Sequence, residues 1–263
     1  YYGKGNVEGY RRASRLSIEE AGRQLRYRFL TRTAMQYGFS RIATGHHLDD
    51  NAEVMLMRIL SGSGRLGLSG IPLIRDGYII RPLLGLSRNE INAYAAALGL
   101  RFVEDETNSD DAYLRNRIRH RLIPFLKETF NPGLHRALGR LALISADEDH
   151  LLNEIGEKAL KDAIVSELNN SLTISRSGMR QNGAAIQRRM LRAAISRVKG
   201  DTRGFGLHHI ELIRRLLESK EYPKTLHLPG RILAICDGRV LTLTLSPVSH
   251  RVRFARVNLD EAI

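Results

Sequence analysis

The first hundred residues alternate between segments with apolar residues at helical spacing and short apolar runs that are typical of strands. Three helices are predicted: residues 17–38, with Ser17 as the N-cap, residues 48–60, and residues 87–99, with Ser87 as the N-cap. Short extended segments are predicted at residues 41–45, 78–80 and 101–104. Because helices and strands alternate, we expect a parallel sheet covered by helices.

The rest of the chain has a different pattern. Apolar residues at helical spacing continue from Leu134 to Leu168 and return in residues 184–198 and 208–217. Residues 225–245 alternate apolar and polar positions around two turn signals, which predicts a small β meander packed on helices. We therefore place a domain boundary near residues 122–135.

Composition and charge are those of a globular protein with a polyanionic partner. Apolar residues make up 43% of the 263 residues, and 41 Lys and Arg against 28 Asp and Glu give a net charge of +13. This charge favours nucleic acid over an anionic membrane surface. No apolar run approaches the roughly 18 residues that a membrane span needs. The single cysteine, Cys236, excludes an internal disulfide, so we expect a cytoplasmic protein.

The densest polar cluster is residues 45–53, Gly-His-His-Leu-Asp-Asp-Asn-Ala-Glu, between a predicted strand and a predicted helix. Ligands bind at this junction in open parallel sheets, and a glycine lets them approach the backbone closely. Asp50 and Glu53 are three residues apart and share one helix face. Two such carboxylates suit a cationic ligand, a proton transfer or a hard metal ion. Acids in a first helical turn are also ordinary partners of the helix dipole.

A second cluster joins an acidic loop, residues 104–111, to a basic segment, residues 115–121. The arginines at every second position of this segment cannot all lie on one helix face. Their guanidinium groups therefore point in different directions, which suits contacts with several phosphates or carboxylates. The alternative is local ion pairing between the acidic loop and the basic segment.

A third cluster lies in the predicted helix of residues 184–198. Arg188, Arg189 and Arg192 are predicted to form its solvent face, opposite a buried apolar stripe. Contact with an RNA backbone and an ordinary solvated face are equally good interpretations of these arginines.

Several motifs in a fixed order resemble those of tRNA(Ile)-lysidine synthetases, a family of ATP-pyrophosphatases with a PP-loop. The resemblance extends over roughly residues 14–245. Its most particular element is the Asp-Glu-x-Asn…Tyr-x-Arg-Asn pattern of residues 105–116. The motifs that carry it are residues 17–27, 45–53, 62–68, 80–83 and 104–119, and in the second half residues 187–192 and 226–230.

The resemblance implies an α/β fold class: a partial doubly wound parallel sheet of the ATP-pyrophosphatase type, followed by a mostly helical α+β domain. Residues 1–128 would be the C-terminal part of the catalytic domain. Residues 129–248 would be a tRNA-binding domain, and residues 249–263 the start of a further segment.

The family's reaction gives the expected function and partners. ATP adenylates the wobble cytidine (position 34 of the tRNA) of an isoleucine tRNA with a CAU anticodon, and L-lysine then displaces AMP to give lysidine. The cofactor implied is ATP with Mg²⁺, and no residue of this chain is assigned as a metal ligand. No membrane partner is expected. The oligomeric state is left open, with a homodimer as one option.

The resemblance also suggests site residues. His46, Asp50 and Glu53 are the expected catalytic group, for binding the ammonium of lysine, holding the activated cytidine or transferring a proton. Gly45 is expected to contact the cofactor, and Arg188, Arg189 and Arg192 the tRNA. The expected substrate-binding residues are Arg26, His47, Asp49, Arg115, Asn116 and Arg119.

One element of the family pattern is missing. The nucleotide loop Ser-Gly-Gly-x-Asp-Ser, which follows the first strand in the family, is not present. The nearest stretch, Ser61-Gly-Ser-Gly64, follows a helix instead. Since the chain begins with Tyr1 rather than methionine, we expect it to start partway through the catalytic domain.

Two alternatives remain. The first is another ATP-pyrophosphatase that modifies tRNA, such as a thiolase, although sulfur and cluster chemistry commonly needs more than one cysteine. The second is a basic RNA-binding module without activity. Release of AMP that depends on lysine would separate the family's reaction from both.

Overall fold

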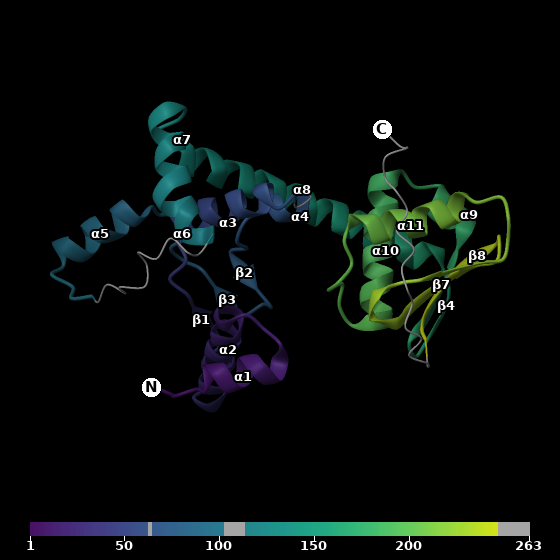
Figure 1. The fold of residues 1–263 in the computed structure, drawn as a ribbon, viewed down its shortest axis with the longest axis horizontal. Coiled ribbons are helices and arrows are strands. Elements are labelled where there is room, and N and C mark those ends of the chain that lie inside the picture. The colour runs from purple at the N-terminus through teal and green to yellow at the C-terminus, as the bar shows by residue number, and fades with distance from the viewer. Residues whose placement is uncertain (63–64, 103–113, 247–263) are drawn as a thin grey trace. The chain divides into compact units, whose positions relative to one another are not determined.

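The computed structural model describes residues 1–62, 65–102 and 114–246. It consists of two compact units, Tyr1–Ala146 and Asp147–Ile263 (Figure 1). Across the three described ranges, no helix is long and apolar enough to cross a membrane.

The first unit contains a small sheet with the strand order β1-β3-β2. Its strands are β1 (Ile42–Ala43), β2 (Ile74–Arg75) and β3 (Ile79–Ile80). β1 and β3 are parallel, as predicted, with Ile42 opposite Ile79. β2 is antiparallel to β3 and was not predicted, although the Asp-Gly turn between the two strands is a strong hairpin signal.

The rest of the first unit is mainly helical, and α2 contacts β1. Ser17 caps α2 by accepting a hydrogen bond from the Glu20 backbone N–H at 3.2 Å, and Ser87 caps α5 in a capping box with Glu90. Both N-caps were predicted. The helical segments are α1 (Val7–Ser14), α2 (Ile18–Gln36), α3 (Leu48–Leu60), α4 (Arg65–Leu68), α5 (Arg88–Ala97), α6 (Leu114–Arg117), a π-helical turn (Ile118–Leu122) and α7 (Ile123–Thr129).

A long helix, α8 (Leu134–Ala163), passes from the first unit into the second. Its first turns pack Leu138 and Ala142 against the apolar face of α3, together with Ile118 of the π-helical turn. The two compact units divide after Ala146, inside α8. The functional boundary near residues 122–135 stays a prediction. The predicted extended segment after α5 is different: residues 101–102 have no regular structure, and residues 103–104 lie outside the described range.

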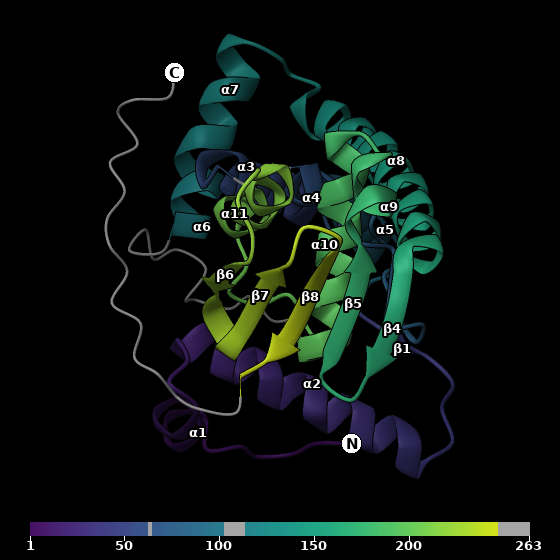
Figure 2. The same ribbon diagram turned by 90° about the vertical axis from the view of Figure 1, so that its right-hand side faces the viewer.

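The second unit is an antiparallel sheet with the order β4-β5-β8-β7-β6 (Figure 2). The predicted meander forms β6 (Lys224–His227), β7 (Ile232–Cys236) and β8 (Val240–Leu245). The prediction of helix to Leu168 is wrong, because α8 ends at Ala163 and β4 (Ile164–Leu168) forms a hairpin with β5 (Ser171–Ser175). β-branched residues and an Asn at a positive φ of 64° favour this hairpin.

Three further helices belong to the second unit: α9 (Arg176–Arg180), α10 (Ala184–Lys199) and α11 (Leu207–Glu218). α10 packs against β5 and β8, and α11 packs against β6 and β7. Their apolar faces and the inward residues of the strands form one continuous core that includes Leu191, Ile195 and Ile213. Residues 249–263, which we expect to begin a further segment, lie outside the described residues.

Candidate functional site

The carboxyl end of β1 leads into the N-terminus of α3, and this junction carries two buried acids. Asp50 and Glu53 are 8% and 1% exposed. The backbone N–H of His47, the N-cap residue, donates a hydrogen bond to Asp50 Oδ2 at 3.1 Å. This hydrogen bond at the start of α3 fixes the position of the Asp50 carboxylate.

Two arginines from α6 and the π-helical turn hold these acids. Arg115 donates through Nε to Glu53 Oε2 at 2.6 Å and through Nη2 to Asp50 Oδ1 at 2.5 Å. Arg119 donates through Nε to Glu53 Oε1 at 2.5 Å and through Nη2 to Glu53 Oε2 at 3.1 Å. For these two arginines, the described partners are the acids of α3. The acidic loop of residues 104–111 lies outside the described range.

The acids of this cluster favour the charged form of Arg115. Burial disfavours the charge of Arg115, but its hydrogen bond to Glu53 and the charges of Glu53 and Asp50 outweigh that cost and raise its pKa. Removing one member of such a buried pair typically costs about 3–5 kcal/mol, because the other charge is left without compensation.

His46 lies beside this charged cluster and is itself uncharged at pH 7. Its Nδ1 lies 2.9 Å from Thr44 Oγ1. Burial lowers its pKa below the ordinary value, and the positive charges of Arg81 and Arg115 act in the same direction, although Asp50 opposes them. His46 is therefore neutral at pH 7 and able to accept a proton.

A cavity of about 500 Å³ adjoins Glu53 on the side of α7 and α8. Asp49 lies in its wall, 3.7 Å from His47 and 3.8 Å from His135. Burial acts to raise the pKa of Asp49, but His47, the backbone N–H of Arg88 and the charge of His135 lower it to about 2. His135 was not predicted, because the helix that carries it lies far along the sequence.

The site gives limited support for cofactor groups. A Cβ on Gly45 would meet no atom of the described residues within 4 Å, so their packing does not require this glycine and leaves room beside the strand end. The carboxylates do not fit Mg²⁺ in this arrangement, because guanidinium groups hold both of them. Among the described residues, no group of three or more His, Cys, Asp or Glu side chains could hold a metal ion.

Asn116 and Arg26, which are also predicted to bind substrate, lie in different surroundings from one another. Asn116 lies in α6 between the two inward arginines and is half-buried. Arg26 is exposed on α2 and lines a separate cavity of about 470 Å³ near Lys4 and Phe29. By contrast, Arg23 and the buried Arg81 act electrostatically on His46 and were not predicted as site residues.

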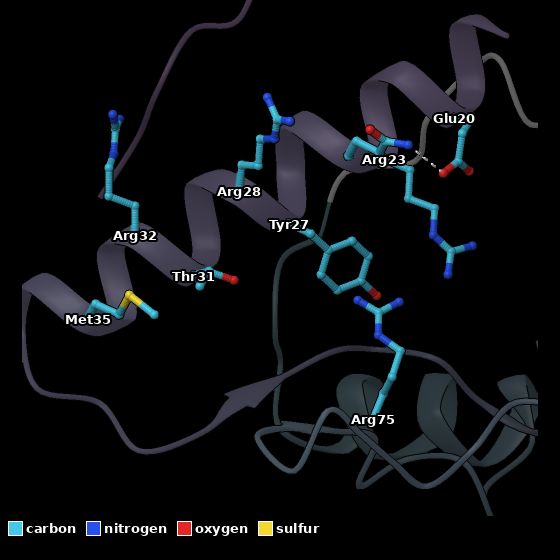
Figure 3. A pocket seen from close by; sticks show the side chains of 9 residues that line it. Glu20, Arg23, Tyr27, Arg28, Thr31, Arg32, Met35 and Arg75 are labelled. Carbon is cyan, nitrogen blue, oxygen red and sulfur yellow. Dashed lines mark hydrogen bonds between the residues drawn. The ribbon is translucent and has the colours of Figure 1, made fainter. Parts of the chain in front are cut away.

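A further cavity, of about 560 Å³, lies along α2 and is rich in arginine. Figure 3 shows the guanidinium group of Arg75 beneath the ring of Tyr27, while Arg28 and Arg32 extend away from it. Arg75 lies 4.2 Å from the centre of that ring, and Arg23 lies 5.7 Å from it. Both distances are within the range of cation–π interactions, so Tyr27 contacts two cations.

The three arginines of α10 are not a freely solvated face, contrary to the sequence prediction. Arg188 donates to Glu211 at 2.6 Å, and Arg189, with a side chain 11% exposed, pairs with Asp149 on α8. Burial lowers the pKa of Arg192, and the charge of Arg189 adds to this effect. Contact between α10 and an RNA remains a prediction.

Comparison with known proteins defines the class. Residues 4–126 match the family of PP-loop domains. The match extends over most of the first unit, including the parallel β1–β3 pair and the candidate site at the carboxyl end of β1.

The particular relatives are tRNA(Ile)-lysidine synthases, to which the chain is homologous over most of its length. It is 42% identical to that of Geobacter sulfurreducens over 83% of this chain and 46% of the relative. It is 36% identical to that of Clostridioides difficile over 91% of this chain and 52% of the relative. The chain thus spans about half the length of the curated relatives it matches.

Proposed function

We propose that the protein to which this chain belongs is a tRNA(Ile)-lysidine synthetase. It adenylates the wobble cytidine of an isoleucine tRNA with ATP and attaches L-lysine in place of AMP. The observation that carries the proposal is the buried pair Asp50 and Glu53 at the carboxyl end of β1, in a chain homologous to enzymes of that name.

The chemistry of lysine fits this pair. An ammonium group needs carboxylates that are held in place and shielded from water, and Asp50 and Glu53 provide them. Arg115 and Arg119 occupy the same oxygens. The arginines would therefore move onto the lysine carboxylate or a phosphate as the ammonium enters.

His46 is proposed as the proton acceptor. An amine attacks only after it has lost a proton, and a neutral histidine beside Asp50 can take that proton. We assign to substrate binding His47, Asp49, Arg26 and Asn116, and to cofactor binding Gly45. ATP with Mg²⁺ is the proposed cofactor, and no residue of this chain is assigned as a ligand of the metal ion.

The remaining proposals concern the protein as a whole. Residues 129–248 would bind the tRNA through α10, including Arg188, Arg189 and Arg192, and residues 1–128 would carry the chemistry. The location would be cytoplasmic, with a homodimer as one option for the assembly.

The test is incorporation of labelled lysine into an isoleucine tRNA with a CAU anticodon, with ATP present. It is run on this chain and, beside it, on the complete product of its gene. Lysine attachment and release of AMP by the gene product are expected. ATP-dependent modification without lysine would instead favour another tRNA-modifying ATP-pyrophosphatase, and tRNA binding without AMP release would favour a binding module.

A further inference from the structure

The arginines of residues 115–121 divide between two faces of one helical segment. Arg115 and Arg119 are half-buried and face the acids of α3, whereas Arg117 and Arg121 are exposed. Residues two apart lie about 200° apart on an α-helix and somewhat less on the wider π-helical turn, so they face opposite sides in both, and residues four apart lie about one turn apart. The exposed pair therefore lies opposite the pair that holds the candidate site.

The exposed side continues into two aromatic rings. Phe125 lies one turn beyond Arg121 on α7 and is 54% exposed, and Phe130 is 70% exposed. Their ring centroids lie 5.8 Å apart with the planes at 75°. We call this surface the outer face, made up of Arg117, Arg121, Phe125 and Phe130.

Cations and exposed rings in one row are the combination that binds single-stranded nucleic acid. Guanidinium groups contact successive phosphates, and each base can stack on an aromatic side chain whatever its identity. We propose that the outer face binds the unpaired nucleotides that flank the reacting nucleotide of the RNA substrate.

Continuity with the candidate site favours RNA over a protein partner. The inner side of the same segment carries the arginines on Asp50 and Glu53, so a nucleotide that reaches these acids brings its neighbours to this helix. The chain's net charge of +13 also favours a polyanion. The inference rests on the proposed function and extends it from the reacting nucleotide to its neighbours.

The test measures binding of an isolated anticodon stem–loop RNA of the isoleucine tRNA to the complete gene product over a range of salt concentrations. Phe125→Ala is expected to weaken binding by roughly 5- to 100-fold through loss of stacking, and Phe125→Tyr to retain it. Arg117→Ala plus Arg121→Ala is expected to lower the slope of log K against log salt by about 1.4, which is two contacts at about 0.7 each.

Matched controls remove the same groups elsewhere in the first unit. Phe39→Ala removes an exposed ring at the amino end of β1, and Arg12→Ala plus Arg41→Ala removes two exposed cations. All of these side chains are exposed, so folding is expected to persist. Equal effects of outer-face and control variants would overturn the inference, as would unchanged RNA binding accompanied by loss of a protein partner.

Lysine attachment by the unmodified protein is measured separately. Failure of the outer-face inference can then be told apart from failure of the proposed function. If lysine is attached but the outer-face variants bind RNA like the controls, the inference falls and the proposed function stands. If no lysine is attached but the outer-face variants alone lose the stem–loop, the outer face stands as an RNA surface without the proposed chemistry.

Discussion

The centres of the two units are built from different chemistry. In the second unit, α10 and α11 cover the sheet with fully buried apolar residues such as Leu191 and Ile213. In the first unit, α3 divides its buried positions between apolar Met55 and charged Glu53. Buried ion pairs contribute little net stability, because desolvation of the charges offsets their attraction. The second unit is thus organised for stability, and the first keeps charges buried where a ligand could use them.

The largest effect is expected from Asp50→Ala. Loss of this carboxylate is expected to abolish lysine attachment while tRNA binding persists, because the acid holds the reacting amine and not the RNA backbone. Lysine incorporation and tRNA binding are measured on the same preparation. Retained incorporation would remove Asp50 from the proposed site and make the charged centre of the first unit merely structural.

The second-largest effect is expected in the free energy of unfolding, which is compared for one buried residue at the centre of each unit. Glu53→Ala leaves Arg115 and Arg119 without their main partner and is expected to cost about 3–5 kcal/mol. Leu191→Ala opens a cavity in the second unit and is expected to cost about 2–5 kcal/mol. Urea unfolding followed by circular dichroism measures both.

An exposed acid serves as the control for this comparison. Glu154→Ala removes a carboxylate with a side chain 64% exposed and is expected to change the free energy of unfolding by less than about 0.5 kcal/mol. Loss of lysine incorporation in Leu191→Ala at a temperature where it remains folded would contradict the division of roles between the units.

A smaller effect is expected on the rate of lysine attachment when the pH is lowered. Because the pKa of His46 lies below the ordinary 6.5, the residue is neutral at pH 7 and becomes protonated as the pH falls through that lowered pKa. The rate of lysine attachment should therefore fall on the acid side of pH 6.5, with an inflection that His46→Ala removes. The inflection is read from kcat/KM for lysine, and its persistence in His46→Ala would assign it to another group.

The smallest effect is expected in the second unit. Arg192→Ala should lower the slope of log K against log salt for tRNA binding by about 0.9, the contribution of one phosphate contact. Arg189→Ala is less suitable, since it also breaks the pair with Asp149 on α8. If the slope is unchanged in Arg192→Ala, the role of α10 is purely structural.

Local signals in the sequence were sufficient for much of the fold. The N-caps at Ser17 and Ser87, the helix that begins at Leu48 and the meander of residues 224–245 all depend on neighbours within a few residues. The β4–β5 hairpin was missed because its apolar residues also fit a continuation of α8. Packing of Leu138 and Ala142 on α3 could not be predicted either, because it is a tertiary contact between distant parts of the chain.

The spacing of three residues between Asp50 and Glu53 is enough to place both on the first turns of one helix. That Arg115 and Arg119 hold these acids, that His135 faces Asp49 and that Arg26 lies elsewhere depends on how the chain folds in three dimensions. Helical spacing separates the faces of one segment but does not specify what each face meets. Those partners come from distant parts of the chain, and the packing of α3 against the π-helical turn and α8 brings them together.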